Sequence, residues 1–236
     1  MNLTSPDYKG FRFPPAMISH AGWLYFRFSL SFRAVEELLA QRGVVVTDET
    51  VRQWCRKFGQ SYAQERRRRR PRCGDTWHLD EVVLTSRGKK HYLWRAVDQD
   101  GTVLDILLQR RRHKKAAQRF FRKLLKGRRG VPRVIITEKL RSYGAANRES
   151  LPGAPHRQHK GLTNRAENAQ QPPRLREKKM RKFKSAGPAQ RFLAAFGPLS
   201  SHFQPRRHRL SAGEYHAILQ TRFQTWNEIT GVKLLG

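Results

Sequence analysis

The stretch from Thr76 to Leu84 constrains the fold of this chain more than any other part of the sequence. It is an apolar run with several β-branched residues, a composition that predicts a buried strand. Asp80 lies in the middle of this run, and burying a carboxylate costs several kcal/mol unless another group compensates its charge. A turn cap, an arginine partner or a bound cation could compensate it, and for a lone aspartate the first two are the commoner outcomes.

Two later carboxylates change that balance in favour of a metal site. Glu138 ends a second apolar run, which starts at Val134. Glu167 lies in Asn164–Asn168, a helix-like segment in a very basic context. The chain has 18 Asp and Glu residues against 49 Lys and Arg residues. Three carboxylates at such positions in a chain with so little acid therefore indicate a metal site.

The charge of the chain indicates the class of its partner. Its 236 residues carry a formal net charge of +31, which favours a polyanion and nucleic acid first. An anionic membrane surface is the second candidate, but the sequence has no long apolar run and no signal peptide. Cys55 and Cys73 form no CxxC pair and no Cys/His cluster, so we expect reduced thiols in a cytoplasmic protein and neither zinc nor a disulfide.

The N-terminal part, residues 1–62, has the pattern of a helix-turn-helix domain. We expect three helices, with caps at Ser31 and at Thr47 or Asp48 and a stop at Gly43; they cover Ala16–Arg27, Phe32–Gln41 and Glu49–Gln60. A Gly-containing turn between the last two helices is typical of this motif, although other three-helix units share it. In the third helix, the recognition helix, the side chains available to DNA are Thr50, Arg52, Gln53, Arg56 and Lys57.

A basic linker is expected at residues 63–74, where the run Glu65–Arg72 favours an irregular segment that contacts phosphates. The pattern then changes to strands. Three strands are expected first, at Thr76–Thr85, Lys90–Asp98 and Val103–Gln109. A helix at Ala116–Lys126, a strand at Arg133–Glu138, a short helix at Ser142–Glu149 and a short strand at His156–His159 follow. This α/β order predicts a ribonuclease H-like domain at residues 75–185, a mixed sheet flanked by helices. A C-terminal helical extension, 186–236, would complete a core or form dimer contacts.

Four segments carry a resemblance to a known family: Trp77–Glu81, Tyr92–Asp98, Thr137–Ala146 and Asn164–Asn168. Together they resemble bacterial insertion-sequence transposases, most closely the insertion-sequence-six family, which includes insertion sequence twenty-six. The resemblance extends over essentially the whole chain. It implies a DDE transposase with a helix-turn-helix domain that binds terminal inverted repeats of double-stranded DNA, acting on target DNA as a homodimer near the bacterial nucleoid.

The resemblance also implies a mechanism and a set of site residues. Asp80, Glu138 and Glu167 would be the catalytic metal ligands, with Asp80 bridging two Mg²⁺ ions, for which Mn²⁺ can substitute. Two such ions, about 3.5–4 Å apart, would activate the attacking oxygen and stabilise the leaving oxygen. The family has a basic residue about two turns after the last acid, and Arg174 matches it, although Pro172 and Pro173 interrupt a helix there. Further phosphate contacts are expected from Lys139 and Arg141.

The middle acid departs from the family pattern, because Glu138 stands where these enzymes have Asp. The longer side chain moves the carboxylate outward by about 1.5 Å. Mg²⁺ demands near-ideal octahedral geometry, and a misplacement of about 1 Å can cost about a hundredfold in rate. We therefore expect weakened or lost activity, unless the end of the strand shifts to compensate.

Two other functions fit the same charge. The first is a catalytically inactive protein that binds inverted repeats and represses transposition. The second is a general RNA-binding or nucleoid protein, which would show no preference for a terminal repeat.

Three further residues are weaker candidates for the site. Glu81 points to the opposite face of the strand from Asp80, and His78 shares the Asp80 face but is more typical of a structural histidine. His156 could contact DNA, and exposure is the simpler expectation.

Overall fold

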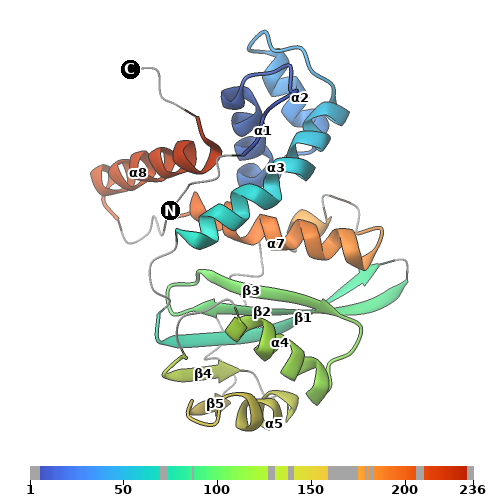
Figure 1. The fold of residues 1–236 in the computed structure, drawn as a ribbon, viewed down its shortest axis with the longest axis vertical. Coiled ribbons are helices and arrows are strands. Elements are labelled where there is room, and N and C mark those ends of the chain that lie inside the picture. The colour runs from blue at the N-terminus through green and yellow to red at the C-terminus, as the bar shows by residue number, and fades with distance from the viewer. Residues whose placement is uncertain are drawn as a thin grey trace. The chain divides into compact units, whose positions relative to one another are not determined.

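The computed structural model describes residues 6–69, 74–86, 88–126, 131–137, 141–158, 175–178, 180, 183–205 and 210–232. The chain divides into two compact units, Met1–Arg69 with Ala195–Gly236, and Arg70–Ala194 (Figure 1). Helix α7, Ala186–His202, therefore contributes its first half to the second unit and its second half to the first. Within the part of the chain that the structure describes, no helix is long and apolar enough to cross a membrane.

The first unit contains the three predicted N-terminal helices, α1 (Pro15–Phe28), α2 (Phe32–Ala40) and α3 (Asp48–Arg68). The predicted caps are confirmed: the Ser31 side chain accepts a hydrogen bond from the Ala34 N–H, and the Thr47 side chain accepts one from the Thr50 N–H. Gly43, in the turn after α2, has a φ of +75°, a conformation that favours glycine. Short-range chemistry thus sets where α2 and α3 begin and how the chain turns between them.

Helix α3 is longer than the sequence predicted, because it continues to Arg68 instead of ending near Gln60. Tyr62 and Ala63 extend its buried face by another turn. The basic run therefore starts as a helix, where an irregular linker was expected, and its last described residue is Arg69.

The C-terminal helix α8, Ala212–Thr230, completes the core of this unit. The Trp226 ring lies edge-on to Tyr62 of α3 at a centroid distance of 5.2 Å. Tyr8 joins the same cluster: its hydroxyl donates to the Thr230 carbonyl at 2.6 Å and lies 2.8 Å from the Tyr62 hydroxyl. Core completion, one of the two roles expected for the C-terminal extension, is therefore observed.

Helices α1 and α3 approach closely at Gly59, which predicts opposite effects for two glycine-to-alanine changes. A Cβ at Gly59 would lie 2.7 Å from the buried Phe26 Cζ, whereas a Cβ at Gly22 would meet only Tyr62 Cε2, at 3.5 Å. We expect Gly59→Ala to lower the free energy of unfolding by about 1–3 kcal/mol because the ring must shift. Gly22→Ala should raise it by up to about 1 kcal/mol through helix propensity. Urea denaturation of both variants tests this, and equal signs would contradict it.

His202 joins α3, α7 and α8 through hydrogen bonds on both ring nitrogens. Arg66 Nε donates to His202 Nδ1 at 3.0 Å, and His202 Nε2 lies 2.9 Å from the Arg222 carbonyl oxygen. Since Arg66 can only donate, Nδ1 must accept, and Nε2 carries the proton that it donates to the carbonyl. Burial, with the nearby charge of Arg66, lowers the pKa of His202 from 6.5 to about 4.

This neutral histidine predicts a pH dependence of stability. Below pH 6.5 the unfolded chain binds a proton that the folded ring excludes, so stability is present above about pH 6.5 and is lost as the pH falls toward 4. Between pH 7 and pH 4.5 the wild type should lose about 2–3 kcal/mol more than His202→Gln, whose amide keeps a donor and an acceptor but does not titrate. Chemical denaturation at several pH values measures the difference. Parallel pH profiles for the two proteins would contradict the assignment.

The second unit is a five-stranded sheet with the order β3-β2-β1-β4-β5. The strands are β1 (Thr76–Ser86), β2 (Lys89–Asp98), β3 (Val103–Gln109), β4 (Val134–Thr137) and β5 (His156–Gln158). β1, β2 and β3 form an antiparallel meander, and β4 and β5 run parallel to β1. This topology, with α4 (Lys114–Lys126) between β3 and β4 and α5 (Arg141–Ser150) between β4 and β5, is the predicted ribonuclease H-like order.

Each face of the sheet packs against a different set of helices (Figure 1). Trp77, Leu79 and Trp94 point to the face covered by α4 and α5, where both tryptophans are buried. Val82 and Leu93 point to the other face, which packs against the first half of α7. Because side chains alternate along a strand, Asp80 lies on this second face, together with Val82.

Candidate active site on the central strand

Asp80 occupies the middle of β1, the central strand of the sheet. Its side chain is 6% exposed, and its Oδ1 accepts a hydrogen bond from the Glu81 N–H at 2.7 Å. The buried carboxylate predicted from the sequence is therefore present. Glu81 points to the opposite face, as expected, and His78, on the Asp80 face, is buried.

Arg95 is directly opposite Asp80 in the antiparallel pairing of β1 and β2. It is 5% exposed, and its Nε has no hydrogen-bond partner among the residues that the structure describes. Burial lowers the pKa of Arg95 to about 10, while the Asp80 charge acts in the opposite direction, so the guanidinium stays charged at neutral pH. In the sequence Arg95 is only one residue of the Tyr92–Asp98 motif, because the strand register that pairs it with Asp80 is a tertiary feature.

The end of β4 lies beside Asp80. Thr137 is paired with Leu79, and its Oγ1 lies 2.8 Å from Nε2 of His156 on β5. The simpler expectation of an exposed His156 is wrong: the ring is half-buried, and burial lowers its pKa. Sequence reasoning missed this contact, which fixes the end of the strand that leads to Glu138.

The remaining predicted residues of the metal and phosphate site lie outside the described residues: Glu138, Lys139, Glu167 and Arg174. Arg141 begins α5, and its side chain is also outside them. The structure therefore describes one of the three predicted metal ligands, Asp80. Within the described ranges, no group of three His, Cys, Asp or Glu side chains could hold a metal ion.

The predicted DNA-contacting residues lie on the first three turns of α3. Arg52, Gln53, Arg56 and Lys57 are exposed, and Thr50 is half-buried, with its hydroxyl 3.0 Å from that of Thr47. These side chains are available to a ligand, as the sequence analysis expected.

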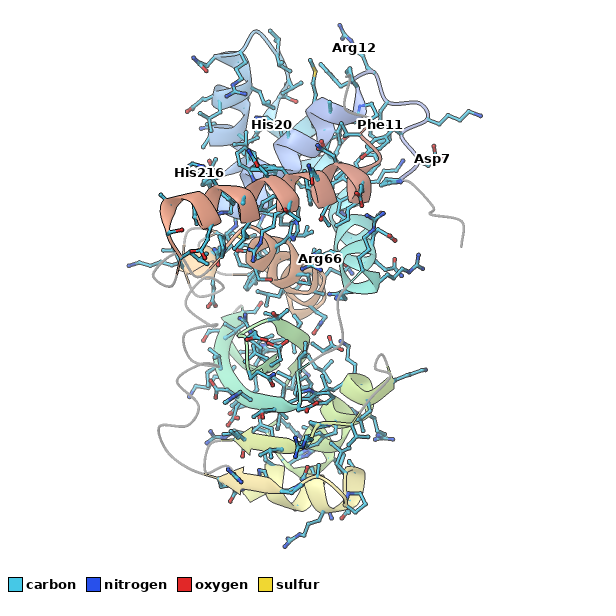
Figure 2. The ribbon with its side chains drawn as sticks, turned by 90° about the vertical axis from the view of Figure 1, so that its left-hand side faces the viewer. Asp7, Phe11, Arg12, His20, Arg66 and His216 are labelled. Carbon is cyan, nitrogen blue, oxygen red and sulfur yellow. The ribbon has the colours of Figure 1, made fainter. Side chains whose placement is uncertain are left out.

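Glu49 organises part of this surface. It accepts hydrogen bonds from Arg52 Nε at 2.6 Å and from Gln53 Nε2 at 3.2 Å, and the Arg52 contact lowers the pKa of Glu49. Lys57 Nζ lies 4.4 Å from the centroid of the Phe11 ring, which is labelled in Figure 2. Neighbouring side chains thus hold Arg52, Gln53 and Lys57 before any ligand arrives.

Comparison with known proteins identifies the family of this chain. A family model described as a DDE domain, that of IS240-type transposases, matches residues 74–206, which is more than half of the chain. The chain belongs to the insertion-sequence-six family of DDE transposases. The predicted resemblance is therefore confirmed, and the matched range includes Asp80, Glu138 and Glu167.

Two transposases of Staphylococcus aureus show the same relationship. The transposase for insertion sequence-like element IS431mec is 33% identical over 135 residues, which cover 57% of this chain and 60% of the relative. The transposase for insertion sequence element IS257 in transposon Tn4003 gives the same identity and coverage. The match thus spans about 60% of the length of these relatives.

Solved structures give a fainter similarity. The catalytic domain of Mos1 mariner transposase is 12% identical, with a TM-score of 0.42. The alignment covers 75% of this chain and 92% of the Mos1 chain. The HTLV-2 integrase catalytic core domain in complex with magnesium is 15% identical, with a TM-score of 0.37. That alignment covers 54% of this chain and 86% of the integrase chain. Scores of this size add nothing to the fold assignment, which follows from the observed strand order.

Asp80 meets the main chemical requirement of a divalent-cation ligand. Mg²⁺ prefers carboxylate oxygens, and a rigid strand holds such a ligand with little freedom. Asp80 is a buried carboxylate at the centre of the sheet, beside the end of β4. Glu138 is the next residue in the sequence after that strand. Asp80 thus suits the role of one ligand of a divalent cation, and the buried Arg95 is an additional positive charge on the same face.

Proposed function

We propose that this chain is a DDE transposase that cleaves and joins DNA strands at the ends of an insertion sequence. The observation that carries the proposal is the buried Asp80 on the central strand of a sheet with ribonuclease H-like order, next to the end of β4. The family match covers the whole segment that contains the three proposed carboxylates.

In this proposal Asp80, Glu138 and Glu167 would hold two Mg²⁺ ions, which Mn²⁺ could replace. The bound ions would supply Lewis acidity to the scissile phosphate. The protein contributes the position of the ligands: β1 fixes Asp80, and the Thr137–His156 contact fixes the strand end before Glu138. Lys139, Arg141 and Arg174 would hold DNA phosphates, and a bidentate arginine fork suits that task.

The partners in this proposal are double-stranded terminal inverted repeats and target DNA. Since two ends must be joined, the chain would act as a homodimer, in the cytoplasm at the nucleoid of a bacterium. The net charge of +31 and the exposed polar face of α3 support DNA as the ligand.

A strand-transfer assay tests the reaction. DNA duplexes that end in the element's own inverted repeat are incubated with the full chain and a plasmid target, in Mg²⁺, in Mn²⁺ and in EDTA. Metal-dependent joining of the duplex to the plasmid is expected. If no joining occurred in either metal while binding to the repeat remained, the chain would be the repressor described below.

The recognition helix gives a separate prediction for binding. Arg52→Ala should lower affinity for the inverted-repeat duplex by about 1–3 kcal/mol, the usual value of a bidentate base contact. Arg33→Ala removes an exposed arginine of α2 and is the matched control for the change in charge. It should lower the affinity for the specific duplex and for a random duplex equally. Fluorescence anisotropy at fixed salt measures both. Equal losses on specific and random DNA for Arg52→Ala would exclude a base contact.

The second candidate function is repression of transposition by a chain that binds inverted repeats without cutting. It is favoured by one observation, the glutamate at position 138 where the family has an aspartate. The fold and the DNA-binding surface would be the same in both cases, so the candidates differ in catalysis alone.

A further inference from the structure

Arg95 introduces a fixed positive charge into the interior of the proposed metal site. Its side chain is 5% exposed on β2 and is paired in register with Asp80 on one side and with Ile106 of β3 on the other. Side chains that face each other across two antiparallel strands have Cβ atoms about 4.5–5.5 Å apart and share one face of the sheet. The two side chains therefore lie on the same face, close enough for the Asp80 charge to raise the pKa of Arg95.

Asp80 is also the buried carboxylate best placed to balance this charge. The other buried acid among the described residues is Asp98, which lies on the opposite face, in register with Trp77. Asp98 Oδ1 accepts hydrogen bonds from the backbone N–H groups of Asp100 and Thr102 in the β2–β3 turn. On the Asp80 face, the neighbours of Arg95 include the apolar side chains Ile106 and Leu93 and the buried His78, which is paired with Val97.

A buried ion is costly to leave unbalanced. Removing one member of a buried charge pair is strongly destabilising, whereas replacing both members by neutral groups is often harmless. A cation next to a metal ligand also repels an incoming divalent ion, since both compete for the same carboxylate. Arg95 therefore has two consequences for the site, one for folding without metal and one for metal affinity.

We propose that Arg95 is the internal counter-cation of Asp80: it balances the carboxylate before metal binds, and it weakens metal binding when DNA is absent. The proposal rests on the proposed metal site. A DNA phosphate adds negative charge to the site, so metal loading becomes favourable when the substrate is in place. Arg95 is thus a positioning residue that acts through Asp80.

The first test is a thermal-stability cycle in EDTA with Asp80→Asn, Arg95→Met and the double variant. Asp80→Asn should lower the Tm because the buried Arg95 loses the carboxylate opposite it, and Arg95→Met should lower the Tm because the buried Asp80 loses a nearby positive charge. The double variant should lose less than the larger of the two single losses. Arg95→Lys, which keeps the charge, should restore most of the stability that Arg95→Met loses. Additive losses in the cycle would overturn the proposal.

The second test is a calorimetric titration with Mn²⁺ in the absence of DNA. Arg95→Met should bind Mn²⁺ at least about tenfold more tightly than wild type, which corresponds to about 1.4 kcal/mol. Lys90→Met removes one positive charge from an exposed position of the same strand and should change the affinity less than about twofold. Unchanged affinity in Arg95→Met would overturn the claim about metal.

The two tests separate this inference from the proposed function. If no variant, wild type included, bound Mn²⁺, the proposed metal chemistry and the effect of Arg95 on it would both fail. The stability cycle would still decide whether Arg95 balances Asp80. If Arg95→Met alone did not fold but the double variant did, that result would itself demonstrate the charge balance.

Discussion

Asp80→Asn should lower the rate of metal-dependent strand transfer by about a thousandfold or more, while binding to the inverted repeat stays within about twofold. In the proposed reaction Asp80 would help to hold the metal ions that stabilise the transition state. When residues act as one catalytic unit, removing one of them abolishes most of the rate enhancement. The amide has the same shape as the carboxylate but carries no charge, so it cannot hold two divalent cations.

The control for this variant is its neighbour. Glu81→Gln makes the same chemical change one residue away, on the opposite face of β1, and should leave the rate within about twofold. Since Asp80→Asn also leaves Arg95 unbalanced, circular dichroism and DNA binding must show that the variant is folded at the assay temperature. Residual strand transfer above a tenth of the wild-type rate would remove Asp80 from the metal site.

Glu138→Asp should raise the strand-transfer rate by about a hundredfold, the usual cost of a misplacement of about 1 Å in a positioned catalytic group. Position 138 follows Thr137, the last residue of β4, whose backbone is held by pairing with both Leu79 and Gln158. A strand end paired on both sides has little freedom to retreat and accommodate a longer side chain. The strand-transfer assay with Mg²⁺ measures the rates of both proteins.

Three outcomes of this comparison are distinct. If only the aspartate variant joins DNA, the wild-type chain is a binding protein in practice, and repression is its surviving function. If both proteins join DNA at similar rates and both lose activity with Asp80→Asn, Glu138 is a competent ligand and the predicted impairment is wrong. If neither joins DNA, the middle acid is not the limiting defect. Thr137→Val, which removes the contact to His156, then tests whether the position of the strand end matters.

The sequence predicted those features of the fold that depend on neighbouring residues. The Ser31 and Thr47 caps follow from local side-chain chemistry, and the structure has both. Side chains alternate along a strand, and Trp94 and Leu93, which are adjacent on β2, accordingly pack in different cores. A buried carboxylate in an apolar strand was likewise visible from Asp80 alone.

Features that depend on pairing between distant segments could not be predicted in this way. The length of α3 depends on Tyr62, which packs against Trp226 from a helix at the other end of the chain. The hydrogen bonds of His202 to Arg66 and Arg222 have the same origin, because local composition carries no information about contacts at such separations.

The sequence by itself determined that an acidic group would be buried in a strand of a very basic chain, because hydrophobic periodicity and net charge are local or additive properties. Only the tertiary structure decided which charge lies next to that acid. A shift of one residue in the pairing of β1 and β2 would place Arg95 on a different partner, and strand register is set by the whole sheet and its two cores. The pairing of Asp80 with Arg95 is therefore a property of the folded sheet.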